Sequence, residues 1–337
     1  MEFAIGMGPT ILKKKGKRTL YSWRLFPVGG FCALEGEDGE DDVEEEPEEE
    51  SPYPPAAEGE EPFYVKPLWQ KIVILAAGAF MNFLTGFLVL LMLTSQGDMV
   101  VTTQIDHFMD GFPYEGETML MPGDKIERIN GYWMFTNADI GTFLAHDAGE
   151  PYEFTVRRDG ELLTVTVPLE KQVYPYETTD ENGNPTTVDR EMYGFVFGTE
   201  PLTFFARIKV AWLNSMDFVR LVKVSLFDLF GGRATVNDLS GPVGISSMIV
   251  ETAQTSMPTM WTLVAMIAVN LAVMNLLPLP AIDGGRIFFL LVGKVVTLIR
   301  RKPLNPKYER AINFGGLVLL LGLMAYVAFN DILRLVR

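Results

Sequence analysis

Three long stretches of the chain are apolar and carry no charged residue, at 72–94, 252–282 and 311–330. A helix needs about 20 mainly apolar residues to cross the hydrocarbon core of a bilayer. A buried helix of a soluble protein could explain one such stretch, but three in one chain favour membrane spans. The pattern therefore predicts an α-helical polytopic membrane protein with three transmembrane helices.

Between the first two apolar stretches the chain changes to short alternating segments that are typical of a β-rich soluble module. Residues 152–158 and 162–167 alternate apolar and polar positions, and Asp159-Gly160 between them is a strong hairpin signal. Residues 122–131 fit a turn, a short strand and a second turn. The range 97–175 is therefore predicted to be an inserted β-rich domain.

Two further segments are predicted to be ordered. Residues 19–26 alternate like a strand and precede a turn at 27–30, so that the region 1–34 is expected to be folded. Residues 202–230 place apolar side chains at helical spacing with charges between them. Such a helix is expected to lie on the outer membrane surface or to pack on the soluble domain.

The acidity of the chain is local. The formal net charge is −15, but residues 25–65 alone hold fifteen Asp or Glu and no Lys or Arg. This insert has too little apolar surface to offset the entropy of ordering, so a disordered, solvated spacer is expected. The rest of the chain is formally neutral, which argues against nucleic acid as a partner. The single cysteine, Cys32, excludes an internal disulfide.

Basic residues give the orientation of the spans. They cluster before the first apolar stretch and between the last two, at Lys13, Lys14, Lys15, Lys17, Arg18, Lys294, Arg300, Arg301, Lys302, Lys307 and Arg310. The positive-inside rule places both clusters in the cytoplasm and residues 97–250 outside. The lipid bilayer is thus a predicted partner, and a multi-pass protein of a bacterial plasma membrane is the expected location.

The predicted organisation has seven parts. They are a membrane-associated β-loop region at 1–34, the acidic insert at 35–65, a transmembrane helix at 66–96, the β-rich domain at 97–175, a strand with the amphipathic helix and an Asp-Leu-Ser-Gly-Pro-Val-Gly-Ile block at 176–250, a transmembrane helix with a proline-rich motif at 251–299, and a basic loop with the last transmembrane helix at 300–337.

The most informative chemistry lies where the second apolar stretch ends at Asp283. An ionisable residue at the end of a span is a functional candidate by default. Here prolines interrupt the helix, and irregular backbone at membrane depth is tolerated only against protein or a wet cavity. The alternative is that Asp283 has no functional role and simply ends the span at the membrane–water interface. The other candidate residues of this segment are Asn270, Asn275, Pro278, Pro280 and Gly284.

This segment resembles the C-terminal signature of the site-2 protease family, Asn-x-x-Pro-x-Pro-x-Leu-Asp-Gly. Residues 275–284 are Asn-Leu-Leu-Pro-Leu-Pro-Ala-Ile-Asp-Gly, with Ile282 for the usual Leu. The resemblance is to intramembrane zinc metalloproteases of the bacterial regulator-of-sigma-E-protease type. It implies that Asp283 is the third ligand of a Zn²⁺ cofactor. It also implies that Asn270 and Asn275, with the neighbouring loop, hold an extended substrate near the metal.

Other blocks of the chain resemble the same family. Residues 3–9 and 25–30 are similar to its membrane-associated β-loop, 78–83 to its second-helix motif, and 238–245 to the block before its third helix. The Gly-Asp-Lys-Ile-x-x-Ile-Asn-Gly spacing within 122–131 resembles a PDZ domain. PDZ domains bind extended peptides at a sheet edge. A plain β-rich domain without a ligand is the alternative.

The chain departs from the family in one respect. The family's first helix carries His-Glu-x-x-His, in which two histidines bind zinc and the glutamate is the general base. Here the only histidines are His107 and His146, both in the predicted soluble domain and outside such a motif. No catalytic residue is therefore assigned, and a chain truncated before Met1 is expected.

The resemblance implies regulated cleavage of transmembrane-helix proteins or peptides, such as anti-sigma factors or signal peptides. The chain as written would be an inactive part of such a protease. A non-catalytic membrane peptide-binding protein or pseudoprotease is the main alternative. A small transporter that uses Asp283 as a cation site is a third hypothesis, with no inverted repeat to support it.

Overall fold

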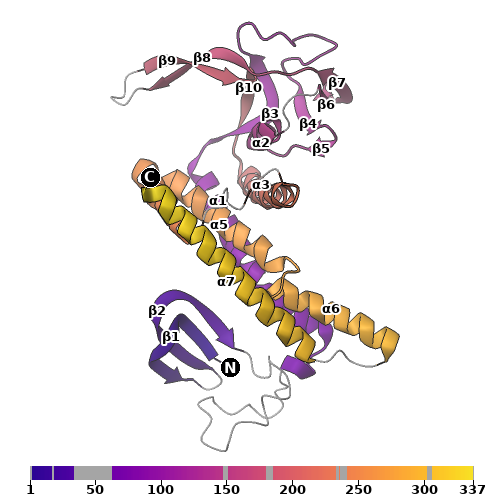
Figure 1. Cartoon of the computed structure of the whole chain (residues 1–337). Helices are drawn as coiled ribbons and strands as arrows, with labels where there is room; N and C mark the ends of the chain where they lie inside the picture. The colour runs from indigo at the N-terminus through magenta and orange to yellow at the C-terminus, as the bar shows by residue number, and fades with distance from the viewer. Residues whose placement is uncertain are drawn as a thin grey trace, which may run out of the picture. The chain divides into compact units, whose positions relative to one another are not determined.

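The computed structural model describes residues 2–16, 19–33, 63–146, 151–179, 185–232, 235, 241–301 and 306–336 (Figure 1). It divides into two compact units. The first unit comprises Met1–Gly78 and Leu276–Gly316, and the second Ala79–Asn275 and Leu317–Arg337. The predicted acidic insert lies outside the described residues, apart from the one-turn 3₁₀ helix η2 (Phe63–Val65).

Three helices are long and apolar enough to cross a membrane, as the hydrophobic pattern predicts. These spans are α1 (Leu68–Gln96), α5 (Met257–Leu276) and Ala311–Arg334 within α7 (Pro306–Val336). The prediction of three apolar spans is therefore confirmed for length and composition.

The second predicted span, 252–282, is wrong in its bounds because it joins parts of separate elements. Helix α4 (Pro242–Thr255) ends at Ser256, whose backbone is extended, and α5 starts at Met257. Pro258 lacks an N–H and is tolerated only in the first turn of a helix, so it cannot continue α4. At the other end α5 stops at Leu276, and α6 (Asp283–Arg300) begins at Asp283.

The N-terminal region of the first unit is a small sheet built from two long, bent strands, β1 (Glu2–Lys15) and β2 (Leu20–Ala33). Residues 2–5 pair in parallel with 20–23 and also lie opposite 30–33, while 12–15 double back along 20–23. The strand predicted at 19–26 is thus confirmed. The turn predicted at 27–30 is part of β2 instead, because the pairing of 30–33 with 2–5 keeps the backbone extended there.

The second unit contains an antiparallel sheet with strand order β10-β3-β4-β6-β7 and β5 paired to β4. The strands of this sheet are β3 (Met99–Phe108), β4 (Lys125–Ile129), β5 (Tyr132–Trp133), β6 (Tyr152–Arg158), β7 (Glu161–Val167) and β10 (Phe195–Pro201). Helix α2 (Asn137–His146) lies between β5 and β6 in the chain, and β8 (Gln172–Thr179) and β9 (Pro185–Met192) form a separate hairpin. We call the sheet with α2 the sheet domain. The predicted hairpin is confirmed: Asp159 and Gly160 both have positive φ between β6 and β7.

The core of the sheet domain forms from alternate residues of these strands. Strand β6 buries Tyr152, Phe154 and Val156 and turns the residues between them outward. β10 lies beyond the predicted boundary at 175 and pairs with β3, where the ring of Phe195 packs against Phe154. The remaining fully buried core residues are Ile105, Leu120, Ile126, Ile129, Ile140, Leu144 and Val167.

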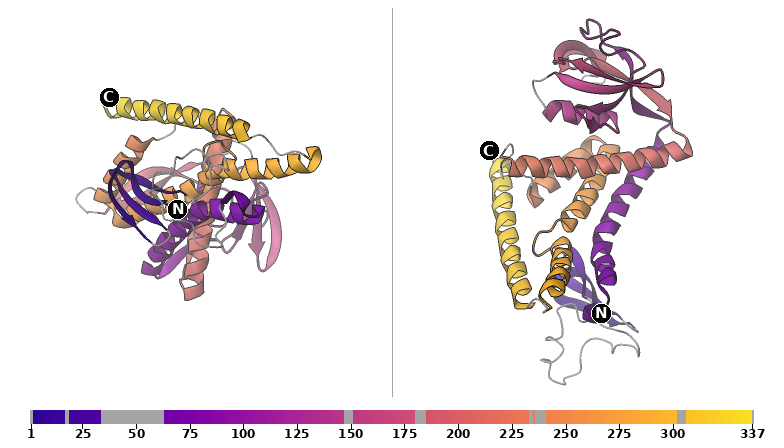
Figure 2. Two further views of the ribbon diagram at one scale, coloured as in Figure 1. Left: turned by 90° about the horizontal axis from the view of Figure 1, so that it is seen from below. Right: turned by 90° about the vertical axis from the view of Figure 1, so that its right-hand side faces the viewer.

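Helix α3 (Phe204–Phe230) connects the sheet domain with the helices of the second unit (Figure 2). Arg207 donates from Nη1 to the carbonyl of Thr94 at 2.7 Å, and Ala211 is buried in a cluster with Leu90 of α1. The helix predicted at 202–230 is confirmed, and the structure shows it packed on both α1 and the sheet domain.

Candidate functional site

The candidate site begins with the irregular segment between α5 and α6. The N–H of Leu279 donates to the carbonyl of Leu277 at 2.7 Å, and Ala281 has φ of +71°. Pro278 and Pro280 explain the break, because neither can donate the N–H that a continued helix requires. Positive φ is rare for a residue with a Cβ and is kept only where neighbouring structure imposes it.

Helix α6 then starts at Asp283, so the carboxylate lies in the first turn of a helix. Gly284 and Gly285 are buried, and a Cβ on either would clash with the carbonyl of Leu277 or Leu279. These glycines therefore allow the start of α6 to lie directly against the irregular segment. The carboxylate also faces α1, since a Cβ on Gly78 would lie 3.7 Å from Oδ2 of Asp283.

The part of α7 that belongs to the first unit fixes the irregular segment. Asn313 Oδ1 accepts the N–H of Ala281 at 3.3 Å. Gly316 packs so closely on Pro280 that a Cβ there would clash with the proline ring. Sequence reasoning missed both residues, because an Asn or a Gly in an apolar helix does not show which loop it contacts.

The substitution Gly316→Ala is expected to destabilise this packing by about 1–3 kcal/mol, the usual cost of forcing a methyl group into a tight contact. The adjacent Gly315→Ala is the matched control, since a Cβ there meets nothing within 4 Å. Alanine at 315 is expected to be neutral or to stabilise by up to about 1 kcal/mol. Thermal unfolding of the two variants in detergent compares them, and equal midpoints would contradict the packing argument.

The two candidate asparagines lie on α5, in the second unit. The side-chain oxygen of Asn270 is buried and has no hydrogen-bond partner among the described residues. Buried acceptors are nearly always paired, so this oxygen is suited to accept a donor from a bound molecule. Asn275 is half-buried and five residues further on, about 140° around the helix.

The described residues do not by themselves make a catalytic zinc site. Among them no group of three or more His, Cys, Asp or Glu is placed to hold a metal, whereas catalytic zinc takes three protein ligands. His107 is exposed on β3 and its Nδ1 lies 2.9 Å from the carboxylate of Asp106. A zinc site that included Asp283 would therefore need further ligands besides these groups.

The Gly-Pro-Val-Gly part of the block at 238–245 caps α4, while residues 238–240 lie outside the described residues. The N–H groups of Gly241 and Gly244 both donate to Oδ2 of Asp331, at 2.9 and 2.8 Å. Asp331 directly follows the uncharged stretch 311–330, and it is buried within α7, which continues to Val336. A carboxylate is stabilised at a helix N-terminus by the free N–H groups, which explains why the span tolerates it.

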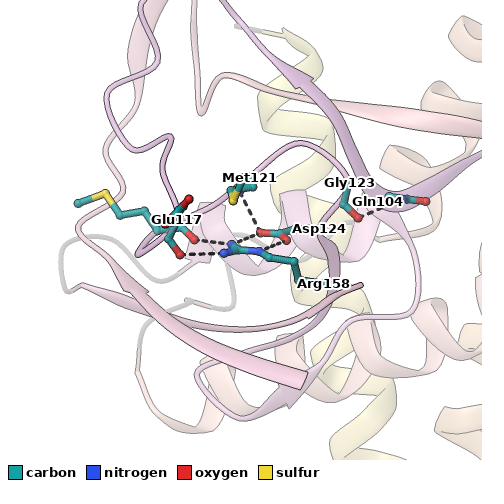
Figure 3. Close-up of polar contacts among 7 residues, drawn as sticks. Gln104, Glu117, Met121, Gly123, Asp124 and Arg158 are labelled. Carbon is teal, nitrogen blue, oxygen red and sulfur yellow. Dashed lines mark hydrogen bonds and ion pairs between the residues drawn. The ribbon is translucent and has the colours of Figure 1, made fainter. Parts of the chain in front are cut away.

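The Gly-Asp-Lys-Ile motif of the sheet domain has a structural role. Asp124 is fully buried, and Arg158 donates from Nε and Nη2 to its two oxygens at 2.7 Å (Figure 3). The same guanidinium donates to the carbonyls of Glu117 and Met119. Hydrogen bonding to Asp124 raises the pKa of Arg158 and keeps it charged. This pair fixes the loop 117–124 on the sheet.

Strand β10 forms one end of the sheet order and pairs with β3 alone among the described strands. Just before it, Tyr193 donates its hydroxyl to the carbonyl of Leu144 in α2 at 2.6 Å. Burial raises the pKa of this tyrosine, so it stays protonated as the donor. The edge of β10 is thereby held near α2, an arrangement that could accept an added strand.

The chain is similar to proteins of one family over nearly its whole length. The model of peptidase family M50 matches residues 1–323. The regulator of sigma-W protease RasP of Bacillus subtilis is 30% identical over 99% of this chain and 91% of its own length. The zinc metalloproteases RasP of Bacillus licheniformis and Geobacillus kaustophilus are each 29% identical, over 99% and 98% of this chain and 91% and 90% of their lengths.

Proposed function

Because the chain belongs to peptidase family M50, the site-2 protease family, we propose that it acts as an intramembrane zinc metalloprotease with Asp283 as one ligand of the metal. Relatives of the chain are named zinc metalloproteases, and Zn²⁺ is the cofactor that these names imply. The observation that carries the proposal is the segment interrupted by prolines. It follows the apolar span Met257–Leu276 in the chain and places the carboxylate of Asp283 in the first turn of α6.

The substrates that we propose are transmembrane helices unwound near this site. RasP of Bacillus subtilis is named a regulator of sigma-W, which makes membrane-embedded anti-sigma factors a proposed substrate class here. An unwound helix presents free N–H groups, and the buried oxygen of Asn270 is an acceptor without a partner among the described residues. We assign Asn275, Pro278, Pro280 and Gly284 to the same substrate-binding region as a prediction.

The sheet domain is proposed to bind peptides in the manner of a PDZ domain, outside the cytoplasm. The edge of β10 and its link to α2 through Tyr193 support strand addition at this place. The basic clusters of the sequence support the orientation, with a bacterial plasma membrane as the proposed location. Peptide binding without cleavage is the second candidate function, because the described residues lack a complete set of metal ligands.

The test uses the native protein, purified in detergent from membranes of its source. We expect it to contain stoichiometric zinc and to cleave a model transmembrane peptide, with cleavage stopped by a zinc chelator and restored by added Zn²⁺. The protein without chelator, kept in the same detergent, is the control. Bound peptide without zinc and without cleavage would refute the protease and leave the peptide-binding protein.

A further inference from the structure

Four polar side chains join the sheet domain to helix α3. Thr136, just before α2, donates its hydroxyl to Oδ2 of Asp217 on α3 at 2.5 Å. Arg220, one turn further along α3, lies 2.5 Å from Oδ1 of Asp139 on α2. The Arg220 guanidinium also lies over the ring of Phe135, 5.0 Å from its centroid.

The charges in this cluster do not balance. Asp139 and Asp217 are both largely buried, with 5% and 14% of their side chains exposed, and Arg220 is the one cation that faces them among the described residues. Arg220 Nη2 is 4.0 Å from Oδ1 of Asp217, too far for a hydrogen bond. That oxygen is buried and has no hydrogen-bond partner among the described residues.

A proton would complete this arrangement. Protonated at Oδ1, Asp217 becomes a donor, and the neighbouring Asp139 carboxylate is the acceptor beside it. Burial, with the nearby charge of Asp139 as a smaller contribution, raises the pKa of Asp217 to about 7, although the bond from Thr136 favours the ionised form. Two carboxylates that share one site cannot both ionise without repulsion.

The cluster joins the sheet domain to α3, so loss of its bonds would change the position of the whole domain. Helix α3 is fixed on its other side by Arg207, by buried Ala211 and by Trp212, whose ring packs edge-on against Phe83 of α1. The sheet domain contacts α3 through the cluster of Thr136, Asp139, Asp217 and Arg220. Changes in the cluster would therefore move the domain relative to α3 while α3 stays on α1.

We propose that Thr136, Asp139, Asp217 and Arg220 form a pH-sensitive latch, which holds the sheet domain on α3 when the two carboxylates share a proton and releases it when both are ionised. This inference goes beyond the proposed protease activity and requires neither zinc nor cleavage. Its consequence for the delivery of substrate would rest on the proposed function, whereas the latch itself is a property of the domain contact.

The direction of the pH dependence follows from the two forms of the latch. In the released form Asp217 is in water and has its ordinary pKa of 3.8, while in the seated form the pKa is about 7. The seated form thus holds a proton that the released form loses between these values. The stabilisation by the latch is fully present below about pH 4 and is lost as the pH rises through about 7. Over this range the ratio of seated to released molecules falls by at most about tenfold for each pH unit.

The test measures the distance between α2 and α3 in the full chain in detergent. Nitroxide labels at Thr142→Cys and Lys223→Cys, both exposed positions, in a Cys32→Ser background give the fraction of seated molecules by pulsed electron resonance. We expect one short distance at pH 5 and a growing population of longer distances up to pH 8. A distribution that is unchanged from pH 5 to pH 8 would overturn the proposal.

Two variants test the assignment to Asp217. Asp217→Asn keeps a donor toward Asp139 without the charge, so we expect a seated domain at every pH. Thr136→Val removes a bond between the sheet domain and α3 that is strongest when Asp217 is ionised, so we expect the midpoint of release to move to lower pH. Asp228→Asn, on the same helix but outside the cluster, is the control and should titrate like the parent. If Asp217→Asn still releases with the parent midpoint, another group controls the contact and the latch is wrong.

Discussion

The substitution Asp283→Ala is expected to remove zinc from the purified native protein and to lower cleavage of a transmembrane substrate by at least about a hundredfold, since even residues that only support metal ligands commonly cost 10- to 100-fold. The expectation follows from the start of α6. The two buried glycines after Asp283 pack this turn against the irregular segment, which fixes the backbone position of residue 283. Metal content by mass spectrometry and a cleavage assay measure the two effects separately.

Asp331→Ala is the matched control for this experiment, because Asp331 is also a carboxylate near the end of an apolar span. Its loss removes the cap of α4, at a cost of about 0.5–2 kcal/mol, but should leave the metal bound. Zinc retained at the parent level in Asp283→Ala would show that Asp283 is not a ligand, even if the native protein proved to be a protease.

Local patterns were enough to predict much of the fold. The apolar stretches predict the spans, and the Asp159-Gly160 turn predicts the β6–β7 hairpin, because each signal depends on neighbours in the sequence. The break in the helix before Asp283 can also be predicted from neighbouring residues, because Pro278 and Pro280 exclude a continued helix. The division of 252–282 was missed because apolar residues on both sides of Ser256 give the same hydropathy signal whether the helix continues or restarts.

The contacts that could not be predicted join residues far apart in the chain. The hydrogen bonds from the N–H groups of Gly241 and Gly244 to Asp331 join residues that are 90 and 87 positions apart in the sequence. Thr136 and Asp217, which are also hydrogen-bonded, are 81 positions apart. A single sequence reports the residue types but not these pairings. Asp331 directly follows the uncharged stretch 311–330, and the sequence does not show that it is a buried partner for the N–H groups of Gly241 and Gly244.

The family resemblance and the structure contribute different parts of the candidate site. The Asn-x-x-Pro-x-Pro motif identified Asp283 as a candidate ligand, which no composition or periodicity could do. The structure adds what holds that residue in place, namely Asn313 and Gly316 of α7 and the close approach of Gly285 to the segment before it. Asn270 and Asn275 stay predictions as substrate-binding residues, and their support is the Asn270 oxygen, which has no hydrogen-bond partner in the part of the chain that the structure describes.

The substitution Asp124→Ala is expected to destabilise the sheet domain by about 3–5 kcal/mol, the cost of leaving one member of a buried ion pair without its partner. Arg158 would keep its charge, with 15% of its side chain exposed, and would lose both bonds to the carboxylate. Hydrogen exchange of the backbone amides of β4 and β6 in the full chain measures the opening free energy of this core directly.

The neighbouring pair Arg157–Glu127 provides the matched control. Its Nε–Oε1 distance is also 2.7 Å, but 43% of the arginine side chain is exposed, so that solvent screens the charges. Glu127→Ala is therefore expected to cost no more than about 1 kcal/mol. A large difference between the two variants would show that burial, rather than the distance between charges, makes the Asp124 pair important. Equal costs would contradict the structural role assigned to Asp124 in the loop 117–124.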